Sequence, residues 1–240
     1  MVLWFVIFLT SCGTSGIIVK ESTKPLAHRL PQPSSIFIFT KEKPNLNDSL
    51  LIGTIINPCH RIRGSIYSVP NPEAFEKEIL WNPDRKLKVS DFKGSTNDKP
   101  FVAATNAYFG YNTRIKPKEN IVIVEVDTYF NCELSYFKNN KNQSLVLNHE
   151  QLHFDITELY ARKFTQRLQL EVKSFKDLVK NVERIGNEVH KELQLKQDAY
   201  DTDVYSDLSQ QSSWDEWTKM GLKELDIYRN KIISRPYRLD

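Results

Sequence analysis

The sequence has few features of a membrane-spanning or nucleic-acid-binding protein. Its N-terminal apolar run, from Val2 to Leu9, is too short to cross a bilayer as a stable helix. It has no stripe of Lys and Arg interleaved with aromatic residues, and its 33 basic and 30 acidic residues give a formal net charge of only +3. We therefore predict no nucleic-acid partner. The 240 residues, of which 40% are hydrophobic, are enough for one sizeable core.

Cysteine is also scarce, with three residues in the chain. Cys12 ends the run Leu9-Thr10-Ser11-Cys12, which resembles a bacterial lipobox, although the first residues lack the Lys or Arg of a typical signal peptide. Residues 1–12 would then be a lipoprotein signal peptide, with Cys12 acylated. This predicts a lipid-anchored protein of the bacterial cell envelope, facing the periplasm or exposed on the outer-membrane surface.

The other two cysteines are Cys59 and Cys132. In an exported protein two such residues can form a disulfide. A metal site is less favoured, because neither has a partner at the spacing of metal ligands. We therefore treat Cys59 and Cys132 as a possible disulfide pair.

Composition divides the chain into segments. Residues 13–35 contain Gly, Ser, Thr and three prolines with little apolar periodicity, which is typical of a tether. Residues 36–75 are predicted to form a small β module, with strands at Ile36–Phe39 and Leu50–Ile56. The main domain is predicted at residues 80–235.

Three further strands are expected at the start of the main domain, at Phe101–Thr105, Ala107–Tyr111 and Ile121–Val126. The last is a continuous apolar run, as in a buried strand. A strand beside an active-site helix can hold an extended peptide by backbone pairing, and any of these strands is a candidate for that role. The alternative is that they only form the core.

The most specific chemical feature is the sequence His149-Glu150-Gln151-Leu152-His153. On a helix the two histidines lie one turn apart, so both rings can bind one zinc ion, and the carboxylate of Glu150 can serve as a general base. The alternative is a pair of capped or solvated histidines on a surface helix. The context favours a helix with a buried side, because apolar residues flank the motif at Leu145, Val146, Leu147, Ile156 and Leu159.

Helix is also predicted for the rest of the chain. Apolar residues at alternating spacings of four and three form one seam, in which Gly186 fills the single gap: Leu168, Val172, Phe175, Val179, Val182, Val189 and Leu193. His190 is expected to be a partly exposed helix residue, and a last helix is predicted at Leu208–Tyr228. The fold class is therefore α+β: a zincin-like domain with an antiparallel or mixed β-sheet, an active-site helix and a C-terminal helical region.

Several motifs occur in a fixed order: Ser90-Asp91-Phe92-Lys93-Gly94, Ala103-Ala104-Thr105, His149 to Ile156, Glu158 to Lys163, and Tyr200-Asp201 before Gln211 and Trp214. Together they resemble a bacterial family of secreted zinc-dependent proteases that carries the label domain of unknown function 922. The resemblance covers about residues 80–228, and its most specific part is the His-Glu-Gln-x-His-Phe-Asp block. It implies an exported metallopeptidase.

The chain departs from the family pattern at two points. Leu152 stands where the family has a glycine, and no histidine follows Asp201. A catalytic zinc ion usually has three protein ligands and accepts a carboxylate as the third, so we predict that His149, His153 and Asp201 bind Zn²⁺. Asp155 points to another side of the helix, where it would anchor a loop or orient a histidine. The alternatives for the third ligand are Asp203, Tyr205 and Glu171.

These observations predict a lipid-anchored zinc-dependent metallopeptidase whose substrate is a peptide or protein and whose catalytic residue is Glu150. Two alternatives remain at this point. One is a non-catalytic cell-envelope lipoprotein with a degenerate zincin fold, and the other is a zinc amidase that acts on the cell wall.

Overall fold

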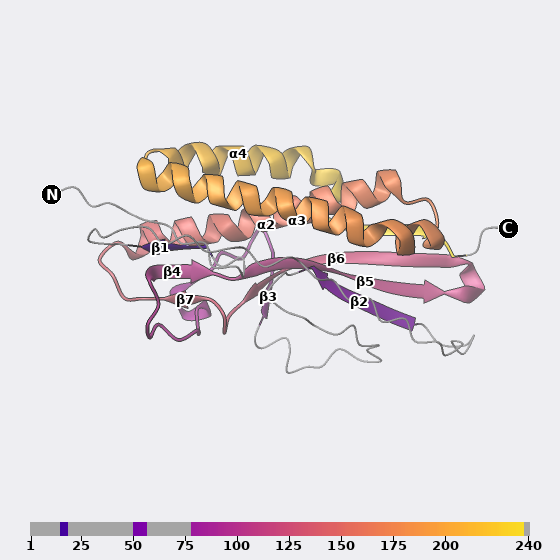
Figure 1. Cartoon of the computed structure of the whole chain (residues 1–240), viewed down its shortest axis with the longest axis horizontal. Helices are drawn as coiled ribbons and strands as arrows, with labels where there is room; N and C mark the ends of the chain where they lie inside the picture. The colour runs from indigo at the N-terminus through magenta and orange to yellow at the C-terminus, as the bar shows by residue number, and fades with distance from the viewer. Residues whose placement is uncertain (1–14, 19–49, 57–77, 238–240) are drawn as a thin grey trace.

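The structure is a computed structural model, and it describes residues 15–18, 50–56 and 78–237. Within these ranges two antiparallel sheets are covered on one face by three helices (Figure 1). The helices are α2 (Gln143–Glu171), α3 (Phe175–Ser206) and α4 (Gln210–Glu224). The predicted α+β class is confirmed: an antiparallel sheet is followed by helices, and the helix that carries the histidines packs against it.

The larger sheet is built around one long hairpin. β5 and β6 pair along their whole lengths, β2 extends the sheet beyond β5, and β3 and β8 pair with the two ends of β6. The strands are β2 (Leu50–Ile56), β5 (Ala107–Lys116), β6 (Ile121–Asn131), β3 (Glu78–Leu80) and β8 (Ile232–Pro236). In the smaller sheet β4 is central, in the order β1 (Ser15–Ile18), β4 (Phe101–Thr105) and β7 (Tyr136–Phe137).

The central hairpin is longer than its apolar runs predict. The strand predicted at Ala107–Tyr111 continues to Lys116, and the one predicted at Ile121–Val126 continues to Asn131. Burial alternates along β6, because successive side chains of a strand point to opposite faces. Its fully buried face points toward the helices and consists of Val122, Val124, Val126, Thr128 and Phe130.

Helix α2 is the centre of the core. Every residue from His149 to Arg162 is buried, since α2 packs against both sheets and is covered by α3 and α4 (Figure 1). Its apolar side chains join those of β5, β6 and α3 in one cluster that includes Phe109, Val124, Phe164 and Ile185. The interpretation of the motif as a pair of solvated histidines on a surface helix is therefore wrong.

The single predicted seam from Leu168 to Leu193 is divided between two helices, so this prediction is wrong. α2 ends at Glu171, and α3 begins after Ser174, whose hydroxyl accepts a hydrogen bond from the backbone N–H of Asp177 at 3.2 Å. Serine favours this N-cap position, because its oxygen satisfies a free N–H of the first turn. The chain reverses there, and the apolar residues on both sides enter the same core.

Several predictions fall wholly or partly outside the described residues. Cys12, Cys59 and the strand predicted at Ile36–Phe39 lie outside them, so lipidation, the disulfide and the domain boundaries stay predictions. The predicted strand Leu50–Ile56 is present as β2 and pairs with β5 of the main sheet. Cys132 is buried and has no disulfide partner among the described residues.

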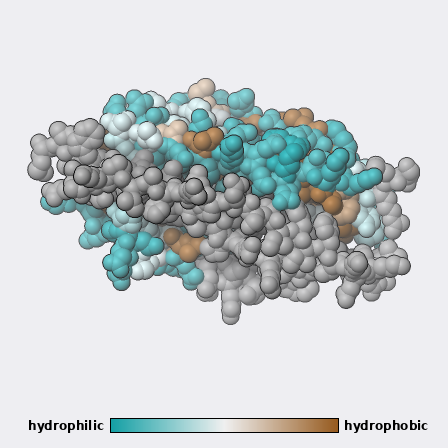
Figure 2. Space-filling model, viewed as in Figure 1, coloured by the Kyte–Doolittle hydropathy of each residue, from teal (hydrophilic) through white to brown (hydrophobic). Residues whose placement is uncertain are grey.

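The described surface seen in Figure 2 is mostly hydrophilic, with small separate hydrophobic areas. The exposed large apolar side chains include Leu195, Met220 and Ile227. In the part of the chain that the structure describes, no helix has the length and apolar character needed to cross a membrane.

A buried ion network fixes α2 to the sheet and to the C-terminal segment. The Glu158 carboxylate, which is fully buried, accepts hydrogen bonds from Arg162 Nε at 2.9 Å, Lys231 Nζ at 3.1 Å and Thr128 Oγ1 at 2.7 Å. Arg162 also donates to the backbone oxygen of Leu222 at 2.8 Å. The network therefore joins α2, β6 and the end of α4.

We expect Arg162→Ala to lower the free energy of unfolding by about 3–5 kcal/mol, because the buried Glu158 carboxylate loses one of its two positively charged partners. The matched control is Arg184→Ala, whose exposed ion pairs with Glu171 and Glu188 are screened by solvent and should contribute little. Urea denaturation measures both. Equal losses in the two variants would contradict a special role for the buried network.

Candidate metal centre

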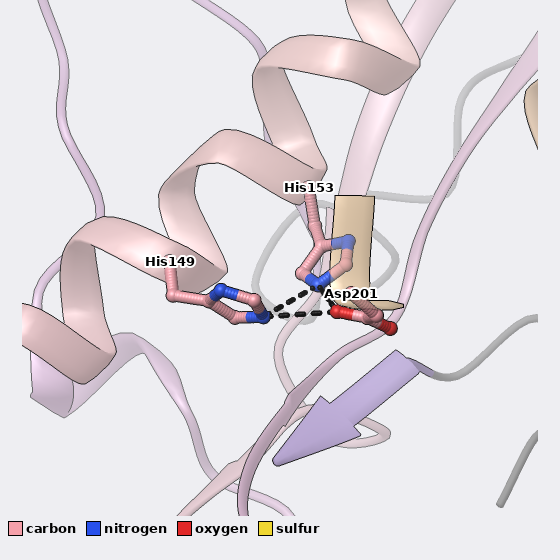
Figure 3. A group of neighbouring side chains, drawn as sticks. All are labelled: His149, His153 and Asp201. Atoms are coloured by element: carbon pink, nitrogen blue, oxygen red, sulfur yellow. Dashed lines mark hydrogen bonds and ion pairs between the residues drawn. The ribbon is translucent and has the colours of Figure 1, made fainter. Parts of the chain in front are cut away.

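Three side chains from two helices converge at one point. His149 and His153 leave successive turns of α2 and meet the carboxylate of Asp201 from α3 (Figure 3). Each Nε2 lies 3.0 Å from Asp201 Oδ1, and the two Nε2 atoms lie 3.1 Å apart. All three side chains are at most 2% exposed. This group could hold a metal ion.

The register between α2 and α3 creates this meeting point. Gln197, Asp201 and Tyr205 are spaced four residues apart on α3, so they lie on one face of that helix, opposite the two histidines. Gln197 contacts His153, Asp201 contacts both rings, and the Tyr205 hydroxyl lies 3.3 Å from His149 Nε2. The two helices therefore run antiparallel through the site.

Gln197 fixes the tautomer of His153. Its Nε2 donates to the backbone oxygen of His153 at 3.0 Å, which turns its Oε1 toward His153 Nδ1 at 2.5 Å. That oxygen is an acceptor, so Nδ1 carries the proton and the neutral ring presents a lone pair at Nε2. Such an outer contact is typical of histidines that bind metals.

The lone pair of His153 Nε2 thus faces Asp201 Oδ1. Both atoms are hydrogen-bond acceptors, so a proton or a metal cation between them is needed to offset their repulsion. Burial opposes charge on His153, but the Asp201 carboxylate outweighs burial and raises the pKa of His153 to about 9. Burial also opposes charge on Asp201, yet His153 lowers the pKa of its carboxyl to about 2. For His149, burial is the largest effect and lowers the pKa. The field that attracts a proton here equally favours a divalent cation.

The size of the triangle and its atoms fit zinc. Ligand atoms about 2.0–2.1 Å from a tetrahedral zinc ion lie roughly 3.3 Å from one another. The observed separations of 3.0–3.1 Å are close to this value. Two imidazole nitrogens and one carboxylate oxygen are ligands that zinc accepts, and three protein ligands leave a fourth position open, as in catalytic zinc sites. The second oxygen of Asp201, Oδ2, is buried without a hydrogen-bond partner among the described residues.

Glu150 places a second buried carboxylate beside the triad. It is fully buried, and neither of its carboxylate oxygens has a hydrogen-bond partner in the described part of the chain. Burial raises the pKa of Glu150 to about 7. Its backbone oxygen accepts a hydrogen bond from Thr105 Oγ1 at 3.1 Å, which ties this turn of α2 to β4. Burial of a carboxylate is costly to the fold and favours its neutral form, which is the direction of this pKa shift.

Two tyrosines of α3 surround His149. The ring of Tyr200 stacks on the imidazole, with ring centroids 4.6 Å apart and planes inclined by 20°. The Tyr200 hydroxyl donates to Gln211 Oε1 at 2.7 Å and lies 3.3 Å from the backbone oxygen of His149. Burial raises the pKa of Tyr205 well above its usual value.

Of the alternative third ligands, Tyr205 reaches the triad and the other two do not. Asp203 is exposed and accepts a hydrogen bond from Trp214 Nε1 at 3.1 Å. Glu171, at the far end of α2, pairs with Arg167 and Arg184 at 2.7 Å each. These two are therefore held by contacts away from the centre.

Asp155 anchors a loop, which is one of the two roles predicted for it. Its carboxylate accepts hydrogen bonds from Trp81 Nε1 at 2.7 Å, Lys86 Nζ at 3.1 Å and Gln151 Nε2 at 2.8 Å. Gln151 Oε1 in turn accepts from the backbone N–H of Leu87 at 2.7 Å. These contacts hold residues 81–87 against the face of α2 that points away from the triad. His190 is half-buried on α3, as predicted.

A cavity of about 970 Å³ lies on that same outer side of α2. It is lined by residues of the 81–87 loop, α2 and α4, including Trp81, Asn148, Gln151 and Lys219. None of its lining residues belongs to the triad, and Glu150 is also absent from the lining. The chemistry of the centre is therefore separate from this cavity.

The chain matches a known family. The model of the family described as "Bacterial protein of unknown function (DUF922)" matches residues 84–206, a range that includes all of α2 and α3 and hence the whole centre. No curated protein and no solved structure shows a significant match to the chain.

Proposed function

The chain belongs to the bacterial DUF922 family, whose function is unknown, and we propose that this member is a zinc-dependent hydrolase that cleaves peptide bonds. The observation that carries the proposal is the combination of two features where α2 meets α3. One is the triad of His149, His153 and Asp201, with separations of 3.0–3.1 Å. The other is the partnerless buried carboxylate of Glu150, one residue from the first histidine.

A site that served only to hold zinc would not need Glu150. Structural zinc sites are closed by four protein ligands, whereas catalytic sites leave one position open. In the described part of the chain, three His, Cys, Asp or Glu side chains meet at this point. Burial of this additional carboxylate is costly to the fold, and proton transfer is a task that fits its position beside the ligands.

Bound zinc would supply Lewis-acid activation of the substrate carbonyl and of the attacking water. Glu150 would take one proton from that water while the new carbon–oxygen bond forms and the carbonyl π electrons move to oxygen. When the carbon–nitrogen bond breaks, Glu150 would return the proton to the leaving amine. Gln197 and Tyr200 hold the two imidazoles in place during these steps, through the His153 Nδ1 contact and the stacked ring.

A peptide substrate is supported by the position of β4 beside the motif. Thr105, the last residue of β4, donates to the backbone of Glu150, so a strand paired with β4 would pass close to the reacting groups. β4 is paired by β1 on one edge and β7 on the other. A substrate that binds by strand addition must therefore replace one of these two strands.

The location of the enzyme follows from the predicted lipobox. Acylation of Cys12 would hold the protein on a membrane of the bacterial envelope, so that the substrate is another envelope protein or peptide. The zinc amidase acting on the cell wall and the non-catalytic lipoprotein are the alternatives. Assays of the purified protein distinguish the three functions: a peptidase cleaves peptides, an amidase cleaves cell-wall amides, and a non-catalytic lipoprotein cleaves neither.

The direct test combines metal analysis with hydrolysis. We expect the purified, zinc-loaded protein to contain about one zinc ion per chain, since the described residues contain one such group of ligands. It should cleave quenched fluorescent peptides. Removal of zinc with 1,10-phenanthroline should abolish cleavage, and added zinc should restore it. Cleavage that is insensitive to the chelator would contradict the proposal, and zinc binding without cleavage of any peptide would favour the alternatives.

A further inference from the structure

The cavity of about 970 Å³ on the outer side of α2 runs between two helices. One wall is a face of α2, from Ser144 to Arg162, and the other is a face of α4, from Asp215 to Lys223. With a rise of about 1.5 Å per residue, the α2 wall is roughly 27 Å long. We call this space the α2–α4 cavity. It is long enough to hold a chain-like ligand.

Apolar side chains from three segments line the α2–α4 cavity. They are Trp81 and Leu87 before the sheet, Leu147 and Leu152 on α2, and Leu222 on α4. Leu87 and Leu152 are buried, and the other three are half-buried. Cavities that bind small molecules have volumes in this range and a mostly apolar lining, with a few polar groups that orient the ligand. The lining therefore fits a ligand with an aliphatic or aromatic body.

The acidic side chains of the lining already have partners within the chain. Asp155 pairs with Lys86 at 3.1 Å, and Asp226 pairs with Arg229 at 2.8 Å. The third, Asp215, accepts hydrogen bonds from two side-chain amides, at 3.0 Å and 3.3 Å. A cationic ligand would therefore compete with an existing partner at each carboxylate.

Two lysines of α4 carry positive charge at the rim of the cavity. Lys219 and Lys223 lie one helical turn apart, and both are exposed and line the cavity. Lys219 is 3.7 Å from Glu216, but these side chains are 78% and 61% exposed, so the pair contributes little. Lys223 forms no ion pair with another described residue. The two ammonium groups therefore favour a ligand with negative charge.

Thr218 supplies a second, independent observation. It is only 1% exposed although it lines the cavity, and its Oγ1 is buried without a hydrogen-bond partner among the described residues. A helical threonine can donate to the backbone oxygen four residues earlier, as Thr165 does to Ala161 at 3.0 Å. The Thr218 hydroxyl is instead left as a donor that an anionic group can satisfy.

We propose that the α2–α4 cavity binds a small amphipathic carboxylate. Its apolar body lies along Trp81 and Leu222, and its carboxylate is held at α4 by Lys219 and Lys223, with a hydrogen bond from Thr218. A free molecule fits this site and a lipid within a membrane does not, because Thr218 is nearly closed to solvent. The lining contains neither the triad nor Glu150, so this proposal does not rest on the proposed hydrolase function.

The test is calorimetry on the full chain with three ligands that share one alkyl chain: decanoate, 1-decanol and decylammonium. We expect saturable binding of decanoate at about one molecule per chain, weaker binding of 1-decanol and no binding of decylammonium. The affinity for decanoate should fall as salt is added, because its charge contacts are exposed. Equal affinities for decanoate and 1-decanol, or no saturable binding of decanoate, would overturn the proposal.

The same titration with and without zinc separates this site from the metal centre. We expect equal affinities for decanoate, since no lining residue of the α2–α4 cavity belongs to the triad. Binding of decanoate that required zinc would instead place its carboxylate on the metal and would overturn the proposal. Hydrolysis plays no part in this measurement, so the two proposals can fail separately.

The double variant Lys219→Gln/Lys223→Gln tests the charge contacts. It should weaken decanoate binding about tenfold, as for the loss of two exposed charge contacts, and leave 1-decanol binding unchanged. The matched control is Lys176→Gln/Lys180→Gln, which removes two exposed lysines with the same spacing from α3, away from the cavity. Equal losses in the two double variants would show a general effect of net charge and would contradict the assignment.

Thr218→Val tests the buried hydroxyl and nearly preserves the shape of the side chain. Because that hydroxyl has no partner among the described residues, the fold should be retained, which circular dichroism verifies. Decanoate binding should weaken about threefold to tenfold, as for the loss of one hydrogen bond. An unchanged affinity would overturn the placement of the carboxylate beside this turn of α4.

Discussion

Replacing His149 or His153 with alanine is expected to abolish the binding of zinc at one ion per chain. Each ring supplies one of three ligand atoms, and the remaining pair cannot complete a zinc site of the catalytic type. The loss should be visible without any activity assay. Wild type with zinc at about 100 times its Kd should gain roughly 2.7 kcal/mol of stability, whereas the variants should gain none.

Metal analysis and thermal unfolding with and without zinc provide the two measurements. His190→Ala is the matched control, because it removes a half-buried histidine of α3 that lies outside the triad and should leave zinc binding unchanged. Circular dichroism verifies that each variant keeps its helices. Zinc stoichiometry unchanged in both His149→Ala and His153→Ala would exclude this site as the place where the metal binds.

The identity of the third ligand is tested by the same zinc measurements on alanine variants of Asp201 and Asp203. Asp201→Ala should weaken zinc binding, since its Oδ1 lies 3.0 Å from both Nε2 atoms. Asp203→Ala removes an exposed carboxylate two residues away, one that accepts a hydrogen bond from Trp214 and is absent from the triad. If Asp203→Ala lost zinc and Asp201→Ala kept it, the triad would be wrong in its third member.

Local patterns predicted the part of this centre that lies on one helix. The spacing of His149 and His153 and the flanking apolar residues depend only on helix geometry, so the sequence was sufficient for them. The same holds for the strands Phe101–Thr105 and Leu50–Ile56, which are present with these bounds. Asp201 was predicted from the resemblance and from zinc chemistry, and the structure brings it to the two histidines.

The contacts between α2 and α3 could not be predicted in this way. Gln197 was missed because a glutamine on a helix has no distinctive pattern, and its role depends on the antiparallel register of the two helices. In retrospect its position four residues before Asp201, like that of Tyr205 four residues after, was the available signal. The division of the apolar seam at Ser174 was also missed, since a helix break changes the direction of the chain but hardly alters the spacing of apolar residues.

The pairing of β3 and β8 with opposite ends of β6 is a further case. The two strands are separated by more than 150 residues, from Leu80 to Ile232, and each is short. Strand pairing at this distance depends on tertiary packing, because local sequence only sets the tendency to be extended. For β8, the contact of Lys231 with Glu158, which also binds Thr128 of β6, is one such tertiary interaction.

Glu150→Gln is expected to keep the zinc and the fold and to lose hydrolysis. The substitution preserves the shape of the side chain and replaces a buried ionisable carboxyl by a neutral amide, so no charge has to be buried and thermal stability should be unchanged or higher. The amide cannot accept a proton from water, and loss of general acid–base catalysis alone costs about 10²–10⁴-fold in kcat. Loss of water activation beside the metal adds to this cost.

The matched control for Glu150→Gln is Glu171→Gln, the same change at the far end of the same helix, where the carboxylate pairs with Arg167 and Arg184. It should hydrolyse peptides at the wild-type rate. Both variants are assayed after zinc loading, with zinc measured in the same samples, so that a lower rate cannot be due to missing metal. If the zinc-loaded Glu150→Gln protein cleaved peptides as fast as wild type, the cleavage would not come from this centre. In the described part of the chain, no other carboxylate beside the triad is fully buried with both oxygens lacking a hydrogen-bond partner. If Glu150→Gln alone lost hydrolysis and kept its zinc, the result would show that the histidines bind the metal and that Glu150 transfers the proton.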